Sequence, residues 1–80
     1  MKVRFFSGIK KLIGCAEADI PYQESVGALV NFLKERYGEA VFGPEIIILI
    51  NGRHAAHLGG FNAIIREDDK IDIFQAVSGG

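Results

Sequence analysis

The sequence of 80 residues predicts an α+β fold in which a mixed sheet of four or five strands packs on one main helix. Three observations predict it: a helical apolar stripe over 26–37, an uncharged aliphatic run over 46–50, and alternating apolar segments near both ends of the chain. Apolar residues make up 49% of the chain and a single cysteine is present, so one compact core without an internal disulfide is expected.

Two short alternating segments begin the chain. Val3 and Phe5 alternate with polar neighbours, and after a break the segment 9–13 tolerates a helix. A second alternating run over 16–20 stops at Pro21, which cannot donate a ladder hydrogen bond. We expect the two runs to pair as antiparallel strands.

The main helix is expected directly after Ser25, whose hydroxyl can accept a backbone N–H of the first turn. Gly38 supplies a left-handed end to the helix, and Pro44 prevents its continuation. The apolar side chains between these signals fall on one stripe of a helix: Val26, Leu29, Val30, Leu33 and Tyr37.

The run over 46–50 is apolar at every position and predicts a strand that is covered on much of both faces. Asn51-Gly52 predicts a hairpin, because both residues tolerate positive φ. A return segment over 53–57 and then a loop over 58–61 are expected to follow.

The last part of the chain begins with an apolar segment over 63–65, which predicts either a short helical turn or an irregular plug. An acidic turn at 67–69 then leads into a last alternating strand over 70–77. For so short a chain, this order of elements fits the β-grasp, or ubiquitin-like, roll, in which the first and last strands lie side by side and parallel at the centre of the sheet.

In such a central pair, Phe6 and Phe74 lie on the face away from the helix, near the carboxyl ends of their strands. Exposed aromatic rings at that place predict a docking patch for a partner protein. The alternative is that one of the rings folds back onto the core.

The other candidate sites favour structural interpretations. His54 and His57 form an H-x-x-H pair without a third ligand, so surface histidines and no metal site are expected. Cys15 is expected to be a half-buried thiol at a strand edge, because the sequence indicates no histidine partner for it. No set of nucleophile, base and oxyanion donors is indicated, so the chain is expected to be acted upon and not to be an enzyme.

The charge and hydropathy of the chain restrict its partners and location. A net charge of −1 offers no electrostatic footprint for nucleic acid or an anionic membrane surface. The longest apolar run is far shorter than a membrane span, and no signal peptide is expected because the first residues contain no long apolar segment. Together with the single cysteine, these features predict a cytoplasmic protein.

The sequence ends on a pair of glycines, Gly79 and Gly80. Glycine has no Cβ, so this segment could serve as a thin stalk that carries a free carboxylate, and the alternative is a frayed end. We expect a single domain over 1–77 and a flexible tail over 78–80.

The whole chain resembles the MoaD/ThiS family of ubiquitin-like sulfur carriers. Its length and ending are closer to MoaD, the small subunit of molybdopterin synthase, and the stretch 57–61 resembles the archaeal-type branch. The resemblance rests on the order of the elements and on Ser25-Val26, Ile50-Asn51-Gly52, Glu67-Asp68-Asp69-Lys70 and Val77-Ser78-Gly79-Gly80.

The resemblance implies a carrier cycle that uses the last residue. An adenylyltransferase similar to ubiquitin-activating enzymes would use ATP to join AMP to the Gly80 carboxylate, and a sulfur donor would displace AMP to give a thiocarboxylate. In the MoaD case the tail inserts into the large subunit of molybdopterin synthase and donates sulfur to a pterin precursor. By position, the partner-contacting residues are Phe6, Phe74 and Val77, and the tail comprises Ser78, Gly79 and Gly80. No cofactor is implied for the chain itself.

Several functions stay open at this point. Many MoaD tails carry Pro-Pro where this chain has Gln75-Ala76, so a looser tail is expected here. A carrier for cysteine or thiamin-type biosynthesis, a modifier joined to lysines through Gly80, and a plain interaction module are the alternatives.

Overall fold

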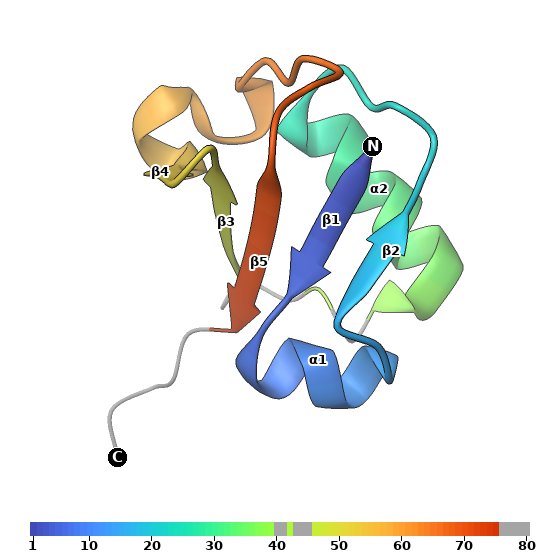
Figure 1. Cartoon of the computed structure of the whole chain (residues 1–80). Helices are drawn as coiled ribbons and strands as arrows, with labels where there is room; N and C mark the ends of the chain where they lie inside the picture. The colour runs from blue at the N-terminus through green and yellow to red at the C-terminus, as the bar shows by residue number, and fades with distance from the viewer. Residues whose placement is uncertain (40–41, 43–45, 76–80) are drawn as a thin grey trace.

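The computed structural model describes residues 1–39, 42 and 46–75. A five-stranded mixed sheet in the order β2-β1-β5-β3-β4 carries helix α2 across one face and the short helix α1 at one end (Figure 1). The predicted α+β β-grasp fold is therefore confirmed. The elements, in chain order, are β1 (Lys2–Phe5), α1 (Ser7–Ile13), β2 (Glu17–Asp19), α2 (Val26–Tyr37), β3 (Ile46–Ile50), β4 (Arg53–His54), η2 (Ala55–Leu58), η3 (Gly60–Asn62) and β5 (Ile71–Gln75).

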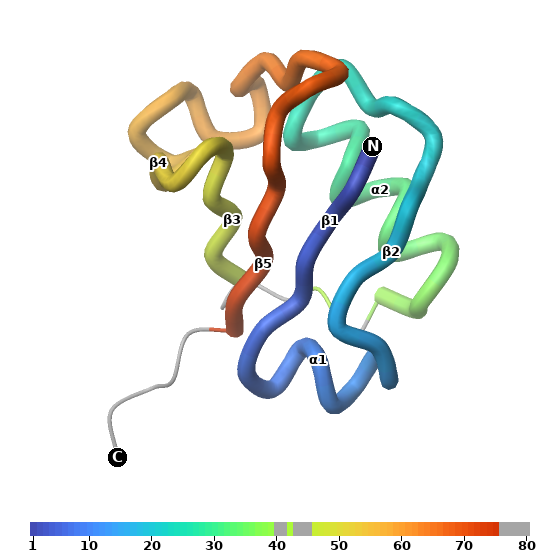
Figure 2. Tube along the Cα trace, viewed as in Figure 1, coloured from blue at the N-terminus to red at the C-terminus, as the bar shows by residue number. Residues whose placement is uncertain are grey.

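The first and last strands form the centre of the sheet, as predicted. β1 and β5 are parallel, with Val3 opposite Ile71 and Phe5 opposite Ile73, and their traces run side by side in Figure 2. All four of these side chains are buried. On its other side β5 pairs with β3 in an antiparallel arrangement, so β5 has a strand neighbour on both sides.

Helix α2 supplies the other half of the core and begins where the sequence predicts. The Ser25 hydroxyl accepts a hydrogen bond from the Ala28 N–H at 3.2 Å, which satisfies one of the free donors of the first turn. Gly38 ends the helix with φ 102° and ψ 145°, so its φ is positive but it does not adopt the predicted left-handed helical conformation. The buried residues of the predicted stripe are Val26, Leu29, Val30 and Leu33.

The segment after β3 differs in part from the prediction. Asn51 and Gly52 form the hairpin with φ of 51° and 82°, as predicted, but the returning strand stops at His54 instead of continuing to residue 57. Ala55 is buried, so the chain turns inward there and continues as η2 and η3 where a loop over 58–61 was predicted. Burial of a small apolar side chain thus ends the strand early.

Further predictions are confirmed, resolved or corrected. As predicted, β3 is covered on much of both faces, since Ile48 and Ile50 are buried on the α2 side, and Ile47 and Leu49 on the other face are half-buried. The segment 63–65 is the irregular plug and not a helical turn: Ala63 and Ile65 are buried, whereas Ile64 is 72% exposed. The last strand was predicted over 70–77. In the structure it begins one residue later and is described over Ile71–Gln75, and the predicted end at residue 77 lies outside the described residues.

The side chain of Asn51 joins the hairpin to the turn that leads into β5. Its Nδ2 donates to Asp69 Oδ1 at 2.8 Å, and its Oδ1 accepts from the Lys70 N–H at 2.9 Å. Asp69 Oδ2 in turn accepts from the Arg66 N–H at 2.8 Å. The hydrogen bond from Arg66, followed by that from Asn51, lowers the pKa of Asp69 below its ordinary value of 3.8. We call this set of residues, Asn51, Arg66, Asp69 and Lys70, the turn clasp.

No described helix has the length and the apolar content to cross a bilayer.

The turn clasp predicts an energetic coupling between Asn51 and Asp69. In a double-mutant cycle of Asn51→Gly and Asp69→Ala, measured by urea unfolding, the coupling free energy should be about 1 kcal/mol in favour of the pair. Glycine keeps the positive φ of position 51, and the cycle cancels its extra chain entropy. A coupling of zero would mean that the side-chain hydrogen bonds add nothing to stability.

The clasp also predicts a dependence of stability on pH. Because the folded state lowers the pKa of Asp69, the stability gained is present above the unfolded value of 3.8 and is lost as pH falls through the lower folded value. The difference in unfolding free energy between the wild type and Asp69→Ala should therefore be larger at neutral pH than at about pH 2.5. A difference that grew on acidification would contradict the assignment.

Candidate functional site

Phe6 and Phe74 stack on the face of the sheet opposite α2, with ring centroids 4.6 Å apart and planes 12° apart. The Phe6 N–H donates to the Ile73 carbonyl at 2.9 Å, so Phe6 extends the pairing of β1 with β5. The sequence predicts exposed rings, but both side chains are half-buried, because each ring covers one face of the other. The rings therefore meet where the sequence predicts, away from the core, and their contact with a partner stays a prediction.

Two residues of β3 extend this apolar surface, and the sequence analysis missed them. Ile47 lies opposite Phe74 in the β3–β5 ladder, and Leu49 lies opposite Asp72. Directly opposed residues point to the same face of a sheet, so both side chains join the two rings. We call Phe6, Phe74, Ile47 and Leu49 the apolar strip. The sequence carried no clear signal for them, because a run that is apolar at every position does not distinguish its two faces.

An ion pair borders the apolar strip. Arg4 donates from Nε and Nη2 to the two carboxylate oxygens of Asp72, at 2.8 and 3.1 Å, and its guanidinium lies 5.4 Å from the centroid of the Phe6 ring. The hydrogen bond to Asp72, and then the charge of that carboxylate, raise the pKa of Arg4 above its ordinary value. The two-bond geometry fixes the orientation of Arg4 at the surface.

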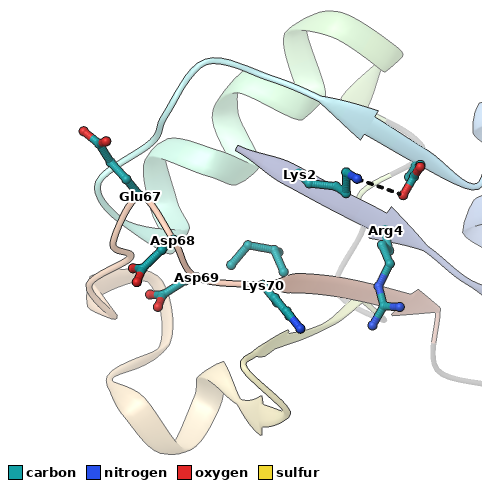
Figure 3. A pocket seen from close by; sticks show the side chains of 8 residues that line it. Lys2, Arg4, Glu67, Asp68, Asp69 and Lys70 are labelled. Atoms are coloured by element: carbon teal, nitrogen blue, oxygen red, sulfur yellow. Dashed lines mark ion pairs between the residues drawn. The ribbon is translucent and has the colours of Figure 1, made fainter.

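The far end of the same face is a shallow pocket of about 440 Å³. Figure 3 shows carboxylates extending from the turn before β5, while Lys2 and Arg4 extend from β1. Lys2 pairs with Glu17 at 4.0 Å. Charged side chains of both signs therefore line this pocket.

The end of β5 rests against helix α1. A Cβ atom at Gly8 would lie 2.1 Å from Gln75 Oε1, so the side chain of Gln75 occupies the space that glycine leaves free. Gln75 is the last described residue of the strand. The predicted tail and contact residues Val77, Ser78, Gly79 and Gly80 lie outside the described part of the chain.

The remaining candidates have local structural roles. His54 Nδ1 accepts a hydrogen bond from the Ala56 N–H at 3.1 Å and so caps η2. Within residues 1–39, 42 and 46–75 no group of three or more His, Cys, Asp or Glu is placed to hold a metal ion. Cys15 is half-buried between α1 and β2.

The sequence model of the ThiS family matches residues 3–80. The chain belongs to the ThiS family. None of the curated proteins matches this ThiS-family chain in sequence.

Several solved structures share the fold. The solution structure of small archaeal modifier protein 1 from Methanosarcina acetivorans is 28% identical with a TM-score of 0.79, covering 99% of this chain and 94% of that one. A BexX/CysO complex from Amycolatopsis orientalis matches at 17% identity and TM-score 0.78, over 99% and 98% of the two chains. A putative molybdopterin converting factor subunit 1 from Pyrococcus furiosus matches at 23% identity and TM-score 0.73, over 95% of each chain. The predicted membership among ubiquitin-like sulfur carriers of the MoaD/ThiS kind is confirmed.

The burial of neighbouring residues in β5 predicts unequal costs of truncation. Phe74→Ala should lower the free energy of unfolding by about 1–2 kcal/mol, because only part of the ring is out of water. The matched variant Ile73→Ala, at a fully buried position, should cost about 2–5 kcal/mol. Urea unfolding of both variants measures the difference, and a larger loss for Phe74→Ala would show that its ring belongs to the core.

Proposed function

We propose that this ThiS-family protein is a sulfur carrier that donates sulfur in molybdopterin biosynthesis from a thiocarboxylate at Gly80. The observation that carries the proposal is the family match, which continues through the glycine pair to residue 80. In the fold, β5 passes directly from the apolar strip toward this segment. The proposal treats residues 1–77 as the docking domain and 78–80 as the tail.

The chemistry follows from the poor reactivity of a carboxylate. A Gly80 carboxylate oxygen attacks the α-phosphorus of ATP and releases pyrophosphate, which leaves an acyl-adenylate. A sulfur nucleophile then attacks the carbonyl carbon, and AMP departs as the leaving group. The carrier supplies only the acyl group, whereas the activating partner holds ATP and the catalytic groups in its own pocket. Glycines at 79 and 80 add no side chain that would clash in a narrow channel.

The apolar strip is the surface that we assign to the partners. Stacked aromatic rings beside aliphatic side chains resemble the centre of a protein interface, and the Arg4–Asp72 pair resembles its charged rim. An adenylyltransferase similar to ubiquitin-activating enzymes and the large subunit of molybdopterin synthase would use this strip in turn. We propose a cytoplasmic location for the carrier, since the cycle consumes ATP.

A second candidate function is protein modification through Gly80. Small archaeal modifier protein 1 from Methanosarcina acetivorans, at 28% identity, favours it. In this case a lysine amine would attack the activated carbonyl and form an isopeptide bond. Both functions need the same activated terminus, so they differ in the nucleophile and not in the docking surface.

Removal of Gly80 should abolish adenylation and leave the fold intact. AMP transfer is measured with the purified activating enzyme and labelled ATP, and thermal unfolding serves as the folding control. The truncated chain should accept no AMP, because its terminal carboxylate would lie one residue short of the reacting phosphorus in the nucleotide pocket. Normal AMP transfer to the truncated chain would overturn both the carrier and the modifier function.

Phe74→Ala should weaken binding to the activating enzyme by about 1–2 kcal/mol. Ile64→Ala is the matched control, because Ile64 is also apolar and is exposed outside the strip. Titration calorimetry should give a weaker affinity for the first variant and an unchanged one for the second. Equal affinities of the two variants would exclude Phe74 from the interface.

Mass spectrometry of the chain recovered from its host separates the two functions. Replacement of one oxygen by sulfur at Gly80 identifies the carrier. Gly-Gly remnants on lysines of other proteins identify the modifier.

A further inference from the structure

The outer edge of β3 is only partly paired, because β4 is two residues long. The Asn51 N–H donates to the Lys70 carbonyl, on the side of β5, at 2.8 Å. Backbone groups alternate in direction along a strand, so those of Ile46, Ile48 and Ile50 point away from β5. Ile50 meets Arg53 of β4. For Ile46 and Ile48, the described residues provide no strand on that side.

Within Ile46–Ile50, this edge lacks the features that normally protect a sheet. Edge strands usually carry a charge, a proline or a bulge that prevents pairing with another chain. β3 instead has the sequence Ile-Ile-Ile-Leu-Ile without any polar side chain. An uncharged edge with free donors and acceptors is a template for one more strand.

An apolar groove of about 200 Å³ lies beside this edge. Its wall includes Phe61, which is 68% exposed. The wall is firmly placed, because a Cβ at Gly27 would lie only 3.2 Å from the Phe61 carbonyl oxygen, so η3 packs closely on α2. The lining residues are Val26, Ile46, Ile48, His54, Ala55, Ala56, Gly60 and Phe61.

We propose that the outer edge of β3 and this groove bind an extended apolar segment of a partner protein, which adds to the sheet as a strand beside Ile46 and Ile48. Strand addition would satisfy the outward backbone groups of Ile46 and Ile48, for which the described residues provide no strand partner, and the groove receives alternate side chains of the added segment. Because Ile46 and Ile48 line the groove, the residues directly opposite them in an added antiparallel strand point into it as well.

The shape of the groove favours a lone strand over a second copy of this chain. η2 and η3 continue from the end of β4 and wall the groove. A second copy that paired through its own β3 would bring its own η2 and η3 against these walls. No carboxylate is among the described lining residues. Arg53, which pairs with Ile50 and precedes the lining residue His54, is exposed, so the segment should carry an acidic residue beside its apolar ones.

This site is separate from the apolar strip. The groove includes Val26 and Ala55, which belong to the buried core on the α2 side of the sheet, whereas the strip lies on the opposite face. Occupation of the groove therefore does not depend on the chemistry at Gly80.

The test uses the full chain labelled with ¹⁵N and an acetylated, amidated peptide of sequence EVTVTVE. Amide hydrogen exchange at Ile46 and Ile48 should be fast in the free protein and at least about tenfold slower with saturating peptide, since strand pairing protects these groups. Phe61→Ala should raise the dissociation constant about fivefold or more. Leu12→Ala is the matched control, because Leu12 is exposed on α1 outside the groove, and it should leave the constant unchanged.

A peptide methylated on every backbone nitrogen provides the second control, because it cannot donate to β3 and should not bind. Equal binding of the methylated peptide would overturn strand addition. Slow exchange of the Ile46 and Ile48 amides without peptide would also overturn the proposal. Protection that is independent of protein concentration would indicate pairing within the chain, and protection that rises with concentration would indicate pairing with a second copy. Failure of millimolar peptide to protect either amide would overturn it directly.

Discussion

The parallel pairing of β1 with β5 is the constraint on which the rest of the structure depends. It joins the two ends of the described chain, as in the Arg4–Asp72 pair between residues 68 positions apart. Contacts between residues so far apart in the sequence require the closure of a long loop, which costs conformational entropy before the contacts stabilise the fold. The inward side chains of both strands, packed under α2, provide that energy by burial. Without β5 in place, β3 would lose its central neighbour and α2 would lose much of the surface that it covers.

The same strand carries the core on one face and the candidate site on the other. Ile71 and Ile73 are buried, whereas Asp72 and Phe74 take part in the outer surface. A period of two residues therefore couples stability to function: a register shift of one residue in β5 would bury the site and expose the core. The same alternation acts at the edge of the sheet. Ile46 and Ile48 turn their side chains toward the groove, and among the described residues no strand pairs with their outward backbone groups.

Local signals in the sequence predicted the elements that depend on local physics. Ser25 with its apolar stripe located α2, and Asn51-Gly52 located the hairpin. The alternation of the first and last strands also placed Phe6 and Phe74 together. The length of β4 could not be predicted, because the burial of Ala55 depends on tertiary packing. Ile47 and Leu49 were missed for a related reason: a run that is apolar at every position does not reveal which side chains face the helix.

The geometry of the central pair has a mechanical consequence. The chain enters β1 at one end of the sheet, and β5 finishes with Gln75 at the opposite end (Figure 1). Because the two strands are adjacent and parallel, tension applied between the beginning of β1 and the end of β5 slides one strand along the other. All of the hydrogen bonds between them then bear the load together, whereas a hairpin pulled at its open end separates one bond at a time. The central pair therefore resists traction applied along β5 better than a hairpin of the same length would.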